Sequence, residues 1–299
     1  MRIDQTLERL DRPVFSFEFF PPKTDDGFAN LRTTLDALRN DEPDFVSVTY
    51  GALGTTRDRT LDIVKWIKQD LDIEAMAHFT CVGATREELS QTLTEMAESG
   101  VDNVLALRGD PPQGETEWKA TEGGLLYSTE LIELLQSEFN FAVGAAAFPE
   151  VHPEAENARS DLEFLKAKQD AGASFFITQL FFDNEFYFDF VAKARDTGIT
   201  VPIIPGIMPV TSVRNIKRIT ELCKSEIPDS FERELSRRED DTEAVEDLGV
   251  AYSTLQCVDL LSRGAPGIHF YTLNRSPATR AILAALRAAK PWTRAWQPV

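Results

Sequence analysis

The sequence predicts an α/β fold: one closed barrel of eight parallel strands surrounded by helices, the (βα)8 or TIM barrel. Three observations predict it. Eight short runs rich in β-branched and aromatic residues alternate with longer segments of helical period. The runs recur at regular intervals, and no linker rich in Pro, Gly or Ser divides the 299 residues, so we expect a single domain over 1–299. An open doubly wound sheet is the alternative, disfavoured because no run is followed by GxGxxG.

Each expected strand is a short apolar run, and every interval between run starts except the last has the length of one strand, one helix and two short loops. Successive starts lie 31, 28, 28, 40, 33, 27 and 66 residues apart. The runs are VFSFEFF (14–20), FVSVTY (45–50), IEAMAHFTC (73–81), VDNVLAL (101–107), FAVGAAA (141–147), SFFITQLFF (174–182), VPIIPGI (201–207) and GIHFYTL (267–273).

The segments between the runs show helical spacing and helix-start signals. Thr85 and Glu88 have the spacing of a capping box, and Ser276 before Pro277 is a typical helix start. The long interval 208–266 must hold more than one helix, and its acid-rich part, 225–247, reads as a solvated helical face. One helical face is formed by Leu61, Val64, Ile67 and Leu71.

Composition excludes several classes of protein. Hydrophobic residues make up 42% and charged residues 27%, as in folded globular proteins. Lys and Arg minus Asp and Glu is 31 − 49 = −18, so nucleic acid and anionic membranes are disfavoured partners. The 3 cysteines and 3 histidines lack metal-ligand spacing, so we expect reduced thiols and no metal site. No signal peptide or membrane span is visible, which predicts a cytoplasmic protein.

The first run places a carboxylate inside the expected barrel. Alternation puts Phe15, Phe17 and Phe19 on one face, suited to the helix layer, and leaves Glu18 pointing into the lumen. An unpaired carboxylate is costly there, so Glu18 is either a functional group or the partner of a lumen Arg or Lys.

Polar residues recur where the runs end. In a TIM barrel all these strand ends open on the rim that bears the active site, so together they predict an enzyme. Each one alone also has a structural explanation: His78 as a core histidine, Gln179 as a loop brace, Arg108 and Asp110 as an ion pair. RGDPP (108–112) with Lys166 and Lys168 is a candidate phosphate-binding set. The rim residues are Thr49, His78, Arg108, Gly109, Asp110, His152, Gln179, Asn274 and Arg275.

Several of these segments closely resemble one family, the 5,10-methylenetetrahydrofolate reductases, which are FAD-binding (βα)8 barrels that make 5-methyltetrahydrofolate. The resemblance covers residues 15–279 in order. The matching segments are FSFEFFPPK, FVSVTYGALGTTRDRT, AHFTC, LALRGDPP, PEVHPEA, DLEFLKAKQDAGASFFITQLFFD, IIPGIMPVTS and HFYTLNRSPAT.

The resemblance implies a role for each matching residue. Glu18 is similar to the family's general acid, which assists opening of the five-membered ring at N10, and Asp110 to the aspartate near flavin and folate. Gln179 and Arg275 match substrate-binding positions. The positions that match FAD contacts are Thr49, His78, Arg108, Gly109, Asp110, Tyr127, Phe148, His152, Asp161 and Lys168.

The implied reaction is ping-pong: NAD(P)H reduces the flavin, leaves, and the flavin reduces the folate in the same pocket, feeding one-carbon metabolism and methionine synthesis. The resemblance also favours a homo-oligomer. It does not distinguish NADH from NADPH.

Two positions depart from the family pattern. Phe148 stands where many members have tyrosine, and Ile219 where some have a stacking aromatic, a role that Phe181 is the candidate to fill. Two alternatives follow: a flavin-free reductase with direct hydride transfer, which Phe148 alone favours, and a silent folate-binding barrel, which the retained Glu18 and Asp110 disfavour.

Overall fold

The computed structural model describes residues 1–9, 11–49, 57–109, 121–275 and 277–292. In that part of the chain nine strands form one sheet, and every paired neighbour is parallel. The strands are β1 (Val14–Phe19), β2 (Phe45–Val48), β3 (Ala75–Thr80), β4 (Asn103–Leu107), β5 (Ala142–Ala147), β6 (Phe175–Thr178), β7 (Ile203–Ile204), β8 (Gly206–Ile207) and β9 (Gly267–Tyr271).

The sheet closes into a barrel through a broken strand. Its order is β7-β6-β5-β4-β3-β2-β1-β9-β8, and its two ends, β7 and β8, are consecutive in the chain across Pro205. Proline has no N–H for the ladder, so the run 201–207 forms two short pieces, one paired with β6 and the other with β9. The predicted eight-stranded barrel is confirmed, with every strand inside its predicted run.

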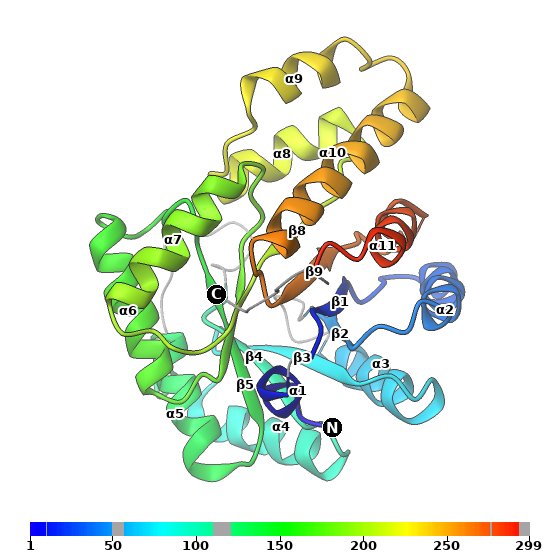
Figure 1. The fold of residues 1–299 in the computed structure, drawn as a ribbon. Coiled ribbons are helices and arrows are strands. Elements are labelled where there is room, and N and C mark those ends of the chain that lie inside the picture. The colour runs from blue at the N-terminus through cyan, green and yellow to red at the C-terminus, as the bar shows by residue number, and fades with distance from the viewer. Residues whose placement is uncertain (10, 50–56, 110–120, 276, 293–299) are drawn as a thin grey trace.

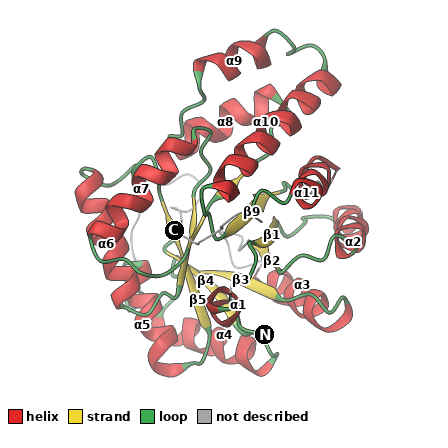
Figure 2. Ribbon diagram, in the orientation of Figure 1, coloured by secondary structure: helices red, strands yellow, loops and turns green. Residues whose placement is uncertain are grey.

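Helices surround the ring of strands (Figure 2). The Thr85–Glu88 capping box is present, and the last helix begins at Pro277, as predicted. The helices are α1 (Ile3–Glu8), α2 (Asp25–Arg39), α3 (Arg57–Asp70), α4 (Arg86–Glu98), α5 (Ser128–Glu138), α6 (Ala158–Asp170), α7 (Asn184–Asp196), α8 (Val213–Cys223), α9 (Asp229–Ser236), α10 (Thr242–Ser262) and α11 (Pro277–Ala289).

Two of the three apolar clusters form the core of the barrel. The larger lies between strands and outer helices and includes Phe15, Phe17 and Phe19, the aromatic face predicted for the first strand. The smaller lines the lower barrel, where Phe45 and Phe175 pack with Leu7 of α1. Apolar side chains thus fill the lumen near the strand amino ends.

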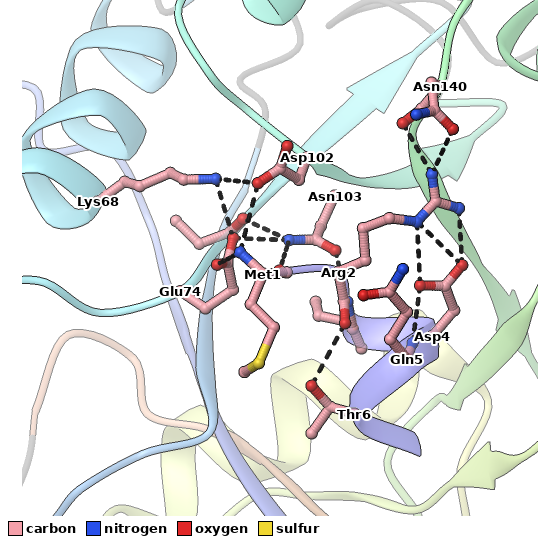
Figure 3. A network of polar contacts seen from close by, with 12 residues as sticks. Met1, Arg2, Asp4, Gln5, Thr6, Lys68, Glu74, Asp102, Asn103 and Asn140 are labelled. Carbon is pink, nitrogen blue, oxygen red and sulfur yellow. Dashed lines mark hydrogen bonds and ion pairs between the residues drawn. The ribbon is translucent and has the colours of Figure 1, made fainter. Parts of the chain in front are cut away.

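The short helix α1 covers the amino ends of the strands. Ile3 and Leu7 insert into the lower cluster, and the Ile3 N–H donates to Asn103 Oδ1 at 2.7 Å. Figure 3 shows the surrounding polar network, in which the Met1 amine and Lys68 both pair with Glu74 and Asp102. This network fixes the chain start across the closed end of the barrel.

The interval 208–266 contains α8, α9 and α10, which stand out from the ring of helices in Figure 1. Phe231 of α9 and Tyr252 of α10 stack at 3.8 Å between ring centroids, which gives this extension its own small core. The acid-rich stretch 225–247 therefore lies mainly on α9 and the start of α10, as a solvated helical surface was expected to do.

No helix within the described ranges is long and apolar enough to cross a membrane. Cys81 and Cys257 are buried and Cys223 is half-buried, and each is a thiol outside any disulfide. Among the residues whose placement is described, His, Cys, Asp and Glu side chains form no group suited to a metal ion.

Candidate active site

Glu18 lies near the carboxyl end of β1 and faces the lumen, as alternation predicts. It pairs in register with Ser47 of β2 on one side and Tyr271 of β9 on the other. Its side chain is only 8% exposed. The carboxylate thus sits directly above the apolar filling of the barrel, where burial without a polar partner is costly.

Among the described residues, two histidines pair with this carboxylate, rather than the lysine or arginine that the alternative explanation requires. His78 Nε2 lies 3.3 Å from Glu18 Oε2, and His269 Nε2 lies 3.6 Å from the same oxygen. Both Nε2 atoms are buried and make no hydrogen bond within the described part of the chain. The site therefore holds polar groups that its own surroundings do not satisfy, a feature common where a ligand binds.

Burial controls the charge of His78. It lowers the pKa of this imidazole to about 4, although the Glu18 carboxylate acts in the opposite direction, and the neighbouring His269 lowers it further. His78 is therefore neutral at physiological pH. It can face Glu18 without forming a buried ion pair.

Thr49 and Gln179 lie at the same rim. The Thr49 N–H donates to Phe19 O at 2.8 Å, so Thr49 continues the β1–β2 pairing beside Glu18. Gln179 follows β6, and its Oε1 accepts the Leu180 N–H at 2.8 Å. That bond is the loop-brace arrangement, and it leaves the half-buried side chain at the rim where ligand contact was expected.

A second polar group joins the ends of β5 and α6. Lys168 Nζ donates to Ala146 O at 2.8 Å, while the Asp161 carboxylate accepts the His152 N–H at 3.0 Å. Burial lowers the pKa of Lys168 to about 8 and raises that of Asp161, and each charge opposes the other's shift. Phe148 meets the His152 ring edge-on at 4.5 Å. The chain thus brings these four residues together.

Arg108 and Gly109 follow β4. Arg108 forms a two-pronged ion pair with Glu154, at 2.5 and 2.9 Å. The suggested pair with Asp110 involves a residue that lies outside the described residues. Gly109 has φ +92°, and a Cβ there would come within 2.7 Å of Val82 Cγ1. Only glycine fits this turn without strain.

Tyr127 and Arg275 stand apart from these groups. Tyr127 precedes α5 with 54% of its surface exposed, and its N–H donates to Glu130 Oε2 at 3.3 Å. Arg275 is exposed and lines a cavity of about 530 Å³ between α2, α11 and the loop after β8. This cavity opens on the rim beside the end of β9.

Two expectations need correction. Phe181 is buried and stacks on Tyr187 in the outer core, so it is not available for stacking at the site. Lys166 pairs with Asp170 on the helix surface, so Lys166 and Lys168 do not form one phosphate-binding pair. Lys168, two positions farther along α6, points into the interior instead, because residues two apart do not share a helical face.

Sequence reasoning missed His269 and Ser16 as site residues. Ser16 Oγ lies 2.8 Å from His269 Nδ1, and both side chains are fully buried. Ser16 shares the lumen face with Glu18 by strand alternation, but nothing local to the sequence reveals that β9 pairs with β1.

The family model that matches this chain is methylenetetrahydrofolate reductase, over residues 2–287. The chain belongs to this family. An Arabidopsis thaliana relative, "Methylenetetrahydrofolate reductase (NADH) 1", is 37% identical across 93% of this chain. The chain spans only 49% of that plant protein, about half its length. The "5,10-methylenetetrahydrofolate reductase" of Escherichia coli is 41% identical, and the match covers 94% of this chain and 93% of that protein.

Among solved structures, a protein from Clostridium thermocellum, described as binding two copies of 5-methyl-5,6,7,8-tetrahydrofolic acid, superimposes with a TM-score of 0.64. It covers 96% of this chain at 19% identity, a likeness of fold. The barrel fold of this chain is therefore also found in a solved structure.

Proposed function

We propose that this methylenetetrahydrofolate reductase family member reduces 5,10-methylenetetrahydrofolate to 5-methyltetrahydrofolate, with NAD(P)H as reductant and FAD as bound hydride carrier in a ping-pong cycle. In this proposal residues 1–299 act as one catalytic barrel. The observation that carries it is the buried Glu18 carboxyl at the lumen rim, facing the Nε2 atoms of two histidines in a chain of this family.

The residues around β4, β5 and α6 fit FAD. Two cations, Arg108 and Lys168, lie by the same loops, and Lys168 is held in the interior, where an anionic group would favour its charged form. Gly109 removes a Cβ from the turn where a ligand would approach. We propose that these residues, with Thr49, His78, Asp110, Tyr127, Phe148, His152 and Asp161, hold FAD, which when bound supplies the hydride that reduces the folate.

Glu18 is the proton donor in this proposal. As the bond between the methylene carbon and N10 breaks, its electron pair stays on N10, which takes the Glu18 proton, and the methylene carbon remains attached to N5 as an iminium cation. A buried carboxyl that faces neutral His78 is suited to deliver this proton without competition from water. We propose that Asp110 stabilises the cation, Gln179 holds the pterin, and Arg275 pairs with the glutamate end of the folate.

The test begins with the absorbance spectrum of the purified protein, followed by anaerobic NADH or NADPH and then methylenetetrahydrofolate. Flavin bands that bleach with the nucleotide and return with the folate support the proposal. A colourless protein that still oxidises NADH when folate is present would replace it with direct hydride transfer, the alternative that Phe148 favours.

Glu18→Gln separates the two half-reactions. The variant is expected to oxidise NADH with an artificial acceptor at close to the normal rate, but to reduce the folate at least about 100-fold more slowly. An equal loss in both half-reactions would contradict the assignment of Glu18 as the acid.

A further inference from the structure

His269 is held rigidly beside Glu18. Its main-chain N–H donates to Pro205 O at 3.0 Å, at the break between β7 and β8. Its ring stacks on Phe45 at 6.2 Å and meets Tyr271 edge-on at 5.3 Å. The imidazole lies with Nδ1 toward Ser16 and Nε2 toward Glu18.

Hydrogen-bond accounting favours one position for the proton on this ring. In the described part of the chain, the one hydrogen bond of the Ser16 hydroxyl is with His269 Nδ1. A buried hydroxyl satisfies itself by donating its hydrogen, which makes Nδ1 the acceptor. A neutral imidazole then carries its proton on Nε2, the atom 3.6 Å from Glu18 Oε2.

We propose that Ser16 and His269 form a positioning pair for Glu18, in which the His269 Nε2–H stabilises the carboxylate that remains after Glu18 releases its proton. The inference rests on the proposed function, since it takes Glu18 as the acid. The present gap exceeds a hydrogen-bond length, as is common for catalytic contacts before the substrate is bound.

The sign of the pH effect follows from this contact. Around Glu18, the described titratable groups are His78 from β3 and His269 and Tyr271 from β9, while β2 contributes the uncharged Ser47. A donor to the carboxylate favours its charged form, so loss of the donor makes Glu18 release its proton less readily. The alkaline limb of folate reduction should then move to higher pH while the plateau rate falls.

The proton position can be measured directly because the chain has only 3 histidines. Nitrogen-15 NMR of histidine-labelled protein, assigned by single substitutions, should show His269 protonated at Nε2, with a hydrogen-bonded Nδ1. Ser16→Ala should remove the hydrogen-bond shift of that Nδ1 resonance. Ser47→Ala is the matched control, because Ser47 is equally buried, its hydroxyl makes no bond to a described residue, and it should leave the resonance unchanged.

Two substitutions test the role in the reaction. Glutamine places an amide N–H near the position of Nε2, whereas asparagine reaches only as far as Nδ1. His269→Asn should therefore slow folate reduction by about 10- to 100-fold and move the alkaline limb upward. His269→Gln should stay within about threefold of the wild type, and both should keep the NADH half-reaction.

The outcomes separate the two proposals. A wild type inert toward the folate overturns the proposed function and with it the role of the pair. An active wild type with His269 protonated at Nδ1, or equal losses in both His269 variants with an unmoved limb, overturns the positioning pair alone.

Discussion

The side-chain amide of Asn274 makes both main-chain hydrogen bonds of Phe20: its Oδ1 accepts the Phe20 N–H and its Nδ2 donates to Phe20 O, each at 2.8 Å. Asn274 adopts φ +59°, a left-handed conformation that asparagine tolerates well. Thr272 Oγ1 also donates to Glu18 O at 2.5 Å. The loop after β9 thus holds the end of the strand that carries Glu18.

Asn274→Asp should weaken this attachment. Aspartate cannot donate to Phe20 O and places a negative charge beside it, so we expect the free energy of unfolding to fall by about 1–3 kcal/mol. Urea unfolding with an unchanged m-value measures the loss. Asn30→Asp, exposed on α2, is the control and should change stability by less than about 0.5 kcal/mol. Equal effects of the two changes would mean that the Phe20 bonds contribute little.

The neutral state of His78 should destabilise the fold in acid. Its pKa falls from 6.5 to about 4 on folding. Between these two pH values His78 is therefore protonated in the unfolded chain but not in the folded chain. The His78 contribution is intact above pH 6.5 and should decline by about 3 kcal/mol as pH falls to 4. The difference in unfolding free energy between wild type and His78→Gln, measured from pH 7 to pH 4, isolates it. A difference that does not vary with pH would refute the burial argument.

Glu150 should have the opposite pH dependence. Its Oε2 accepts the Glu226 N–H at 2.8 Å, its Oε1 is buried, and burial raises its pKa from 4.5 to about 7. The folded state therefore keeps a proton that the unfolded state loses above pH 4.5, and this contribution to stability disappears as pH rises through 7.

Glu150→Gln removes this ionisation and keeps an acceptor for the Glu226 N–H. At pH 8 it should raise the unfolding free energy by about 1 kcal/mol, a value reduced because the side chain is half-buried and partly screened by solvent. Near pH 4 the same variant should match the wild type. Thermal or urea unfolding at the two pH values measures this difference in stability. A gain in stability that is the same at both pH values would mean that the substitution acts through packing instead.

Lys168 and Lys166 provide a matched pair on one helix. Lys168 points into the interior and Lys166 pairs with Asp170 on the surface. Lys168→Met should weaken FAD binding at least about 10-fold, as expected for loss of a charge-assisted contact, and Lys166→Met should not. Flavin fluorescence after dialysis measures the affinity. If both variants retain FAD equally, Lys168 serves the fold alone.

The barrel was predictable because its strands are short, apolar and evenly spaced. Hydrophobic periodicity does not predict the break at Pro205. It also does not predict where 208–266 divides into α8, α9 and α10. Within the site, alternation oriented Glu18 correctly, since that rule acts along a single strand. Its partners His78 and His269 depend on register between strands far apart in the chain, and local sequence carries no record of that register.

The same limit explains the polar partners at the rim. Asp110, two residues from Arg108, was the natural candidate and lies outside the described residues. Among the described residues the Arg108 guanidinium pairs with Glu154, in the loop after β5. The interior direction of Lys168 likewise depends on how α6 rotates against β5, which its nearest sequence neighbours do not set.

The position of α1 limits how substrates can reach the site. Because this helix covers the amino ends of the strands, the nucleotide and the folate of the proposed reaction should both enter at the opposite end, where Glu18 and the rim loops lie. In a barrel that is closed at one end, the two substrates must use the same entrance and therefore compete for it. Either in excess should then obstruct the other, so high folate is expected to act as a competitive inhibitor against the nucleotide in steady-state kinetics.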